Sequence, residues 1–265
     1  MLTGATGGLG RELCFEFARR GARLVISSRS EEKLEQLAGE IMAFGGRAVF
    51  KTADVSVKQE VGELVNFALR SYNGIDVLVN NAGIAHTRLF SAIESEAIEK
   101  EIRINYLGPV FLMKEILPLL LKQRSGQIIN ISSLVAFRPF PLLVSYSATK
   151  AALSALTDAL RIELQSDRLD IINVYLGKLS AGISQQRGPA DENRNKQITS
   201  AGMSPETAAK KIISAAGRNK KTIHTHPEGR LILWINSIWP GLLENLLYRL
   251  KLKANKTGSP NSSAE

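Results

Sequence analysis

Residues 3–10, with the sequence TGATGGLG, decide the fold that we predict for this chain of 265 residues. Gly4, Gly8 and Gly10 follow the spacing T-G-x-x-x-G-x-G. Glycine lets a backbone turn tightly and approach a pyrophosphate without Cβ collisions. A helix that begins near Gly8 would present free N–H groups and a partial positive charge to such an anion. A flexible glycine loop is the alternative interpretation.

Strand-like and helix-like segments alternate after this turn. Short apolar runs predict buried strands at 24–27, 47–55, 75–83, 126–133 and 169–175. Apolar residues at helical spacing predict helices at 30–44, 57–72, 96–124 and 144–166. This alternation indicates an α/β fold: a Rossmann-like, doubly wound parallel sheet flanked by helices.

The beginning of the chain does not fit this fold well. Only Met1, Leu2 and Thr3 precede the glycine turn, whereas a strand usually needs about five residues. The first strand of such a sheet is central, so its loss would leave hydrogen-bonding groups unpaired on both neighbours. We therefore expect a truncated first strand, through a shortened chain or a misplaced start codon.

We expect one dinucleotide-binding catalytic domain over residues 1–225, an apolar helical segment over 226–253 and a disordered tail over 254–265. The run LILWINSIWPGLLENLLYRL at 231–250 is followed by basic residues. It has two interpretations: a helix that closes a pocket or an oligomer contact, and an interfacial membrane segment at 231–253. We see no signal peptide and no run of about 20 apolar residues that would span a bilayer.

The net charge and the cysteine content limit the binding partners and covalent links that we expect. The formal net charge of +9 fits a solvated basic surface or attraction to phosphates or anionic headgroups. We do not expect nucleic-acid binding, because no basic stripe with interleaved aromatic residues and no zinc spacing is present. The single cysteine, Cys14, excludes an internal disulfide and points to simple helix packing. We expect no metal site, and we interpret His224 and His226 as loop residues.

The end of the second predicted strand, Ser27-Ser28-Arg29, bears on cofactor choice. NAD sites usually offer an acidic residue here to the adenine ribose, and this chain has none. Arg29 instead suits a 2′-phosphate, so we expect NADP rather than NAD. A solvated arginine is the alternative. Asp54 and Val55 would lie beside the adenine ring, or Asp54 would be a helix N-cap.

Tyr146 and Lys150 form a Y-x-x-x-K pair, which shares one face of a helix. A lysine ammonium lowers the pKa of a nearby phenol by favouring phenolate. Such a tyrosine can donate a proton in carbonyl reduction and accept one in alcohol oxidation. Ser133 would hold the substrate oxygen or cap a turn. Asn105 would be a helix-bend residue or a polar relay near the lysine.

In this order, the motifs TGATGGLG, SSR, ADV, NNAG, Asn105, ISS and YSATK resemble the short-chain dehydrogenase/reductase family, over residues 3 to about 175. The resemblance implies that Tyr146 is the general acid/base and that Lys150 binds the nicotinamide ribose and lowers the tyrosine pKa. It implies that Ser133 orients the substrate and that Asn105 holds a water linked to the lysine. The expected cofactor-binding residues are Thr3, Gly4, Gly8, Leu9, Gly10, Ser28, Arg29, Asp54, Val55, Asn81, Ala82, Gly83, Tyr146 and Lys150.

Residues 103–133 are similar to membrane-associated dehydrogenase/reductases related to 11β-hydroxysteroid dehydrogenase. The similarity implies a steroid-, retinoid- or lipid-like carbonyl or alcohol, a homodimer or homotetramer, and a membrane-associated (endoplasmic-reticulum-type) or cytoplasmic location. Leu176-Gly177 and Ala181 depart from the Pro-Gly and threonine of the family, although Ser180 lies one position away. A catalytically impaired dinucleotide-binding protein is therefore the alternative function. The polar segment 182–203 suits a mobile lid over the substrate.

Overall fold

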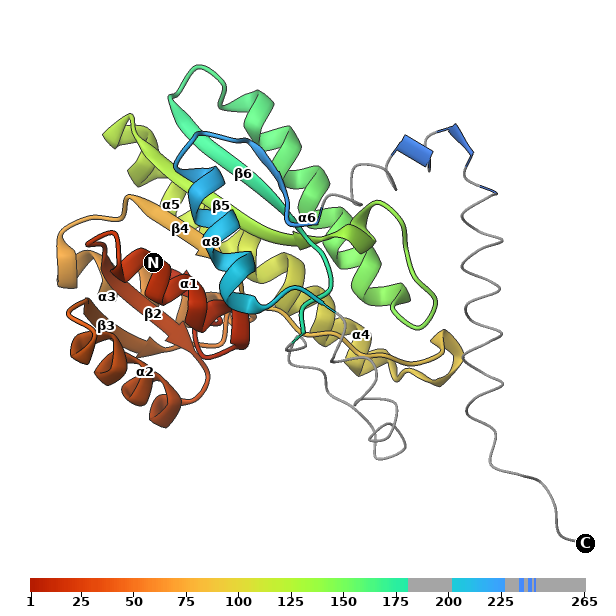
Figure 1. Cartoon of the computed structure of the whole chain (residues 1–265), viewed down its shortest axis with the longest axis horizontal. Helices are drawn as coiled ribbons and strands as arrows, with labels where there is room; N and C mark the ends of the chain where they lie inside the picture. Colours follow the sequence, from red (N-terminus) through yellow and green to blue (C-terminus); the bar gives the residue numbers. More distant parts are fainter. Residues whose placement is uncertain (181–201, 227–233, 236–237, 240, 242–265) are drawn as a thin grey trace, which may run out of the picture.

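A computed structural model describes residues 1–180, 202–226, 234–235, 238–239 and 241. Its centre is a seven-stranded parallel sheet with the strand order β3-β2-β1-β4-β5-β6-β7 (Figure 1). The strands are β1 Leu2–Thr3, β2 Arg23–Ser28, β3 Arg47–Thr52, β4 Val77–Asn80, β5 Gly126–Ser133, β6 Leu169–Leu176 and β7 Thr222–His224. The predicted doubly wound α/β fold is confirmed.

The predicted helices are present, and the largely helical stretch predicted at 96–124 is divided where Gly108 and Pro109 begin a new helix. The α-helices are α1 Gly8–Ala18, α2 Glu31–Ala43, α3 Lys58–Tyr72, α4 Ser95–Ile102, α5 Gly108–Gln123, α6 Val144–Glu163 and α8 Pro205–Ala216. Two short 3-10 turns (η1 Phe90–Ala92 and η3 Leu134–Ala136) and a π-helix (η2 Arg103–Leu107) complete the elements. The single helix predicted at 96–124 is thus α4, η2 and α5 in succession.

Helices cover both faces of the sheet and bury two separate cores. On one face, α1, α2 and α8 contribute Leu13, Leu34 and Ile212, all fully buried. On the other face, α3 and α5 contribute Val61 and Ile116, with α6 packed beside them. Strands buried on both faces explain why their sequences are continuous apolar runs without alternation.

The central strand β1 has two residues, between the six-residue β2 and the four-residue β4. Leu2 is in register with Ile26 of β2 and with Val79 of β4. The Met1 ammonium group donates to the carbonyl oxygen of Val77 at 2.7 Å. The glycine turn therefore leaves from the middle of the sheet, which is where a dinucleotide fold needs it.

Helix α8 begins with a side-chain cap, whereas the cap proposed at Asp54 is wrong. Ser204 is the N-cap of α8, its side chain accepts from Thr207 N–H at 3.1 Å, and Pro205 is the first helical residue. The N-cap of α3 is Val57, not Asp54. The Asp54 carboxylate instead accepts from Ser56 N–H at 2.9 Å and holds the turn before the helix.

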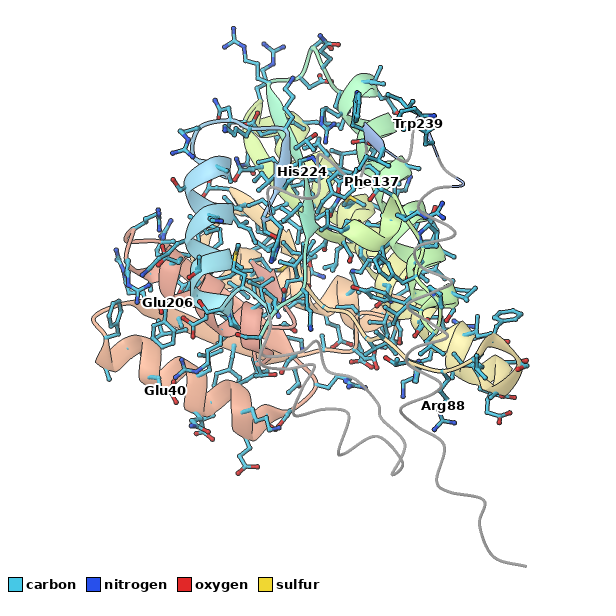
Figure 2. All side chains as sticks on the ribbon, turned by 45° about the vertical axis from the view of Figure 1, so that its right-hand side comes forward. Glu40, Arg88, Phe137, Glu206, His224 and Trp239 are labelled. Atoms are coloured by element: carbon cyan, nitrogen blue, oxygen red, sulfur yellow. The ribbon has the colours of Figure 1, made fainter. Side chains whose placement is uncertain are left out.

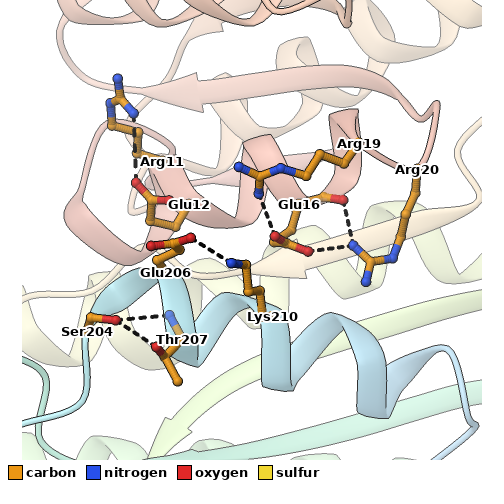
Figure 3. A network of polar contacts seen from close by, with 9 residues as sticks. All are labelled: Arg11, Glu12, Glu16, Arg19, Arg20, Ser204, Glu206, Thr207 and Lys210. Atoms are coloured by element: carbon orange, nitrogen blue, oxygen red, sulfur yellow. Dashed lines mark hydrogen bonds and ion pairs between the residues drawn. The ribbon is translucent and has the colours of Figure 1, made fainter.

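Helix α8 packs alongside α1, and both carry ion pairs where they meet (Figure 3). The buried carboxylate of Glu16 pairs with Arg19 and Arg20 within α1, and Glu206 pairs with Lys210 within α8. Burial raises the pKa of Glu16, but its hydrogen bonds to the two guanidinium groups outweigh that and lower it. The buried charge is thereby paired, and the two ion pairs offset part of its desolvation cost.

One continuous helical stretch, Ser95–Gln123, is long and apolar enough to cross a bilayer by length and composition. The expectation that no such segment exists is therefore wrong. The stretch consists of α4, η2 and α5, and α5 packs against α3 inside the second core. A helix buried in a core needs the same apolar composition as a membrane span, so this feature alone is weak support for a membrane location.

Candidate active site

A cleft of about 420 Å³ lies at the carboxyl ends of the strands. It is centred where the chain order reverses, since β2 and β3 lie on one side of β1 while β4 and β5 lie on the other. Ligands bind at such a switch point in open α/β sheets. The segments that line it follow β1, β2, β3, β4 and β6, together with the end of β5 and part of α6.

The glycine turn forms the floor at one end of the cleft. Gly4 has φ +64°, and a Cβ there would lie 2.7 Å from the Cα of Ala82. A Cβ on Gly10 would overlap the carbonyl oxygen of Gly4. Helix α1 begins at Gly8 with no capping side chain and no acidic residue in its first turn. Its first N–H groups are therefore available to an anion in the cleft.

Thr3 and the NNAG segment fasten this turn to the next strand. The Asn81 side chain donates to the carbonyl oxygens of Thr3 and Gly4, both at 3.0 Å. The Thr3 hydroxyl accepts from Asn81 N–H and Ala82 N–H, both at 3.3 Å. Asn80 donates to Asn130 of β5 at 2.7 Å. Thr3 is 1% exposed and supports the turn from behind, and its expected part in cofactor binding stays a prediction.

The part of the cleft that follows β2 and β3 carries hydroxyl groups that lack hydrogen-bond partners among the described residues. Ser28, Arg29 and Asp54 line it as expected, and so does Lys33, which the sequence analysis missed. The hydroxyl groups of Ser27 and Ser28 are buried without a hydrogen-bond partner among the described residues. Buried polar atoms are nearly always paired in folded proteins. These residues therefore fit a polar ligand such as a dinucleotide ribose.

Tyr146 and Lys150 lie at the other end of the cleft, on one face of α6. They are only 4% and 5% exposed. The Lys150 Nζ atom donates to the carbonyl oxygen of Ile131 at 2.8 Å and lies 5.8 Å from the centre of the Tyr146 ring. Ser133 caps η3 by accepting from Val135 N–H at 3.4 Å and donates to the Leu176 carbonyl at 3.3 Å, so its turn-capping interpretation is confirmed. Its contact with a substrate oxygen stays a prediction.

Burial dominates the proton affinities of this pair. It raises the pKa of Tyr146, a hydrogen bond from Ser133 lowers it, and the charge of Glu101 raises it further. Burial also lowers the pKa of Lys150 to about 8. The cleft by itself therefore holds Tyr146 as a phenol. The causes that shift the pKa of Tyr146 are burial, Ser133 and Glu101, and the lowering effect that the family resemblance implies for Lys150 stays a prediction.

Asn105 lies in the π-helix between α4 and α5, at the point where the helical register changes. Its side chain accepts from Ile84 N–H and donates to the Ile84 carbonyl, both at 2.9 Å. It also donates at 3.1 Å to the hydroxyl of Thr149, the residue before Lys150. π-Helical turns often mark functional sites. Asn105 and Ser133 adjoin the residues that line the described cleft, since Asn105 contacts Ile84 and Thr149 and Ser133 follows Ser132.

His224 corrects another expectation, because it is a strand residue and not a loop residue. It ends β7 and stacks on Tyr175, with ring centres 5.2 Å apart. Phe137 lies 6.0 Å from His224 (Figure 2). His226 does follow the strand, and its ring lies where a Cβ on Gly177 would be. No group of three or more metal-ligating side chains occurs within the described part of the chain.

Two expected features fall outside the described residues. Ala181 and nearly all of the polar segment 182–203 belong to the range that the structure does not describe. Leu176 and Leu179 line the cleft, and the Ser180 hydroxyl donates to the Met203 carbonyl at 3.5 Å. The predicted lid and the effect of Ala181 therefore stay predictions.

The cleft, its glycine turn and its Tyr-Lys pair define the class of protein. The sequence model of the short chain dehydrogenase family matches residues 1–192, and the chain belongs to this family. It is an oxidoreductase that acts on CH–OH groups.

Relatives and solved structures agree with this class. Dehydrogenase/reductase SDR family member 7B of Bos taurus is 30% identical over 97% of this chain and 82% of its own length. The Xenopus tropicalis protein of the same name is 32% identical over 84% of this chain and 75% of its own. A short-chain dehydrogenase structure from Streptomyces avermitilis matches with a TM-score of 0.78 and 25% identity, covering 98% and 97% of the two chains. An alcohol dehydrogenase from Thermococcus sibiricus, complexed with 5-hydroxy-NADP, has a TM-score of 0.72 and 24% identity over 84% of this chain and 93% of its own.

Proposed function

We propose that this protein is an NADP(H)-dependent oxidoreductase that interconverts a carbonyl and an alcohol on an apolar, steroid-, retinoid- or lipid-like substrate. The observation that carries the proposal is the single cleft that joins an uncapped helix N-terminus to a buried tyrosine and lysine on α6. The first suits a pyrophosphate and the second suits proton transfer.

Two cations support the choice of NADP. Arg29 and Lys33 both line the cleft beyond β2, and the residue at the end of β2 is Ser28 rather than a carboxylate. A guanidinium group pairs well with a phosphate, and a second cation adds to that attraction. The unpartnered hydroxyls of Ser27 and Ser28 would hydrogen-bond the ribose or its phosphate. Asp54 and Val55 would flank the adenine ring.

The chain's own residues would manage the proton. A bound nicotinamide supplies or takes up the hydride. Tyr146 would donate its phenolic proton to the substrate oxygen in reduction and take it back in oxidation. Ser133 would hold that oxygen, since it already hydrogen-bonds to Tyr146. Lys150 would bind the nicotinamide ribose. Asn105 would hold Thr149, the residue before the lysine, through its hydrogen bond to the Thr149 hydroxyl.

Apolar side chains around Tyr146 support an apolar substrate. Its ring packs with Ala85, Val135 and Leu143. The loops after β4 and β5 adjoin, because Arg88 N–H donates to the Leu142 carbonyl at 3.0 Å. These loops expose Phe90 and Phe140, and Val144 at the start of α6 is exposed as well. Exposed apolar groups beside a reaction centre are typical of a binding site for apolar ligands.

A peripheral membrane contact through residues 231–253 is also part of the proposal. Among the described residues of this segment, Trp234 is 59% exposed, Trp239 61% and Ile238 48%. Exposed tryptophans suit the headgroup level of a bilayer. Sedimentation with anionic liposomes tests the contact: we expect binding that Trp234→Ala/Trp239→Ala reduces. Failure of the full chain to bind would remove this part of the proposal.

The catalytic proposal is tested with Tyr146→Phe. The variant should lose NADPH-dependent turnover of a panel of apolar aldehydes and ketones by at least about a hundredfold, because the proton donor is gone. It should keep the thermal stabilisation that NADPH produces, because the phosphate end of the cleft is unchanged. Cofactor stabilisation without turnover in the parent protein would instead identify the impaired dinucleotide-binding alternative.

A further inference from the structure

A buried histidine–glutamate pair lies beside the catalytic site and has no part in the function above. Glu101 is 0% exposed and His86 is 7% exposed. Glu101 Oε1 accepts from the backbone N–H of His86 at 2.6 Å and lies 2.9 Å from His86 Nδ1. Glu101 Oε2 is buried and has no hydrogen-bond partner among the described residues. A carboxylate in this setting exerts an electrostatic effect that water scarcely screens.

This pair is connected to the tyrosine through packing as well as charge. Glu101 lies near the end of α4, which packs against α6. His86 follows Ala85, whose side chain contacts Tyr146 in a small buried cluster. Burial and the Glu101 charge both raise the pKa of Tyr146, and only the Ser133 hydrogen bond opposes them.

Few other charges face Glu101 from the elements packed around it. Helix α6 offers Tyr146 and Lys150, and the Lys150 ammonium is directed to the carbonyl oxygen of Ile131. The loop after β4 offers His86 and the exposed Arg88, and the π-helix offers the exposed Arg103. Among the charged groups of the described residues, Glu101 is the one that raises the pKa of Tyr146.

We propose that Glu101, held in place by His86, is a positioning residue that keeps the phenol of Tyr146 protonated over a wider pH range, which suits carbonyl reduction. The proposal rests on Tyr146 as the proton donor. A negative charge near a phenol disfavours phenolate, so the donor form persists to higher pH. His86 keeps the carboxylate at its place between α4 and α6.

A measurement without substrate tests the electrostatic effect directly. The protein has five tyrosines, so ¹³Cζ-tyrosine labelling gives few resonances, and Tyr146→Phe assigns the one of interest. At a fixed alkaline pH where the fold persists, Glu101→Gln should raise the phenolate-to-phenol ratio of Tyr146 beyond the roughly twofold change that we allow for the charge-conserving variant. Glu101→Asp, which keeps the charge, should stay within about twofold of the parent protein.

The matched control is Glu99→Gln, which removes one exposed carboxylate from the same helix. It should leave the ratio unchanged. Equal ratios in Glu101→Gln and Glu99→Gln would overturn the proposal. If Glu101→Gln does not fold, Glu101→Met provides a second uncharged variant of similar length.

The pH profile of carbonyl reduction provides the kinetic test. The rate should fall as pH rises through the ionisation of Tyr146, and Glu101→Gln should move that fall to lower pH. The KM for the carbonyl should stay unchanged, because Glu101 acts through the tyrosine. Absence of turnover in the parent protein would contradict the proposed function, whereas the tyrosine resonance would still decide the role of Glu101.

Discussion

The two ends of the cleft are built from different parts of the chain. At the phosphate end, backbone atoms of the glycine turn and the first turn of α1 face the cleft, and no side chain caps the helix. At the catalytic end, buried side chains of α6 face it, and burial sets their proton affinities. An added side-chain atom at the glycine turn would therefore collide with the backbone. At Tyr146 and Lys150, by contrast, a change of functional group would remove the group that takes part in proton transfer.

The largest effect is expected at the phosphate end, from Gly10→Ala. The new Cβ would overlap the Gly4 carbonyl oxygen and lie 3.0 Å from Ala5 Cα, so the backbone must move. We expect a loss of about 3 kcal/mol in unfolding free energy and loss of NADPH binding. Gly39→Ala in α2 is the control, since nothing lies within 4 Å of its Cβ. It should stabilise the fold by about 0.5–1 kcal/mol, and equal destabilisation by both variants would contradict the account.

At the catalytic end, Lys150→Met should stabilise the fold, whereas Gly10→Ala destabilises it. Burial lowers the pKa of Lys150 from 10.5 to about 8, so the unfolded chain binds more protons between these values. Stability without cofactor should then rise with pH across this window. At pH 7 the variant should be more stable by about 2 kcal/mol, allowing for its lost hydrogen bond, while losing turnover. Thermal unfolding at pH 7 and 10 measures this, and a constant difference would exclude the buried ammonium as the cause.

Arg29→Ala should separate the two cofactors at the phosphate end. Loss of a charge-assisted contact should weaken NADPH binding about tenfold and leave NADH binding unchanged. Titration calorimetry with both cofactors measures the difference. Arg23→Ala, at the opposite end of the same strand, is the control and should affect neither. An equal loss for both cofactors would show that Arg29 does not contact the 2′-phosphate.

The smallest effect concerns a helix start that binds no ligand. Ser204 caps α8, in contrast to the uncapped α1 beside it (Figure 3). Ser204→Ala should cost about 1 kcal/mol of unfolding free energy, because the Thr207 N–H loses its partner. NADPH affinity should stay the same in calorimetry. A change in affinity would mean that the cap of α8 reaches the cleft.

The same contrast explains what the sequence could predict. Residues that act through spacing along the chain, such as Gly4, Gly8, Gly10, Tyr146 and Lys150, are recognisable as motifs. The order of strands follows from their alternation with helices. The predicted cofactor and substrate contacts of these residues stay predictions.

Residues that act through tertiary packing were not predictable. Lys33 reaches the cleft because β2 leads into α2 there, and Glu101 meets His86 only because α4 packs against α6. His224 belongs to a strand because β7 pairs with β6, far away along the chain. Asp54 is not a helix cap because the chain first makes a turn through Ser56. Each depends on contacts between segments that no local pattern records.

Thermal unfolding with NADPH, NADP⁺ and NADH tests the central claim, that this cleft holds a 2′-phosphorylated dinucleotide. A ligand at about 100 times its dissociation constant should add about 2.7 kcal/mol to native stability. We expect stabilisation by NADPH and NADP⁺ and little by NADH at the same concentration. Stabilisation by NADH alone, or by none of the three, would contradict the account.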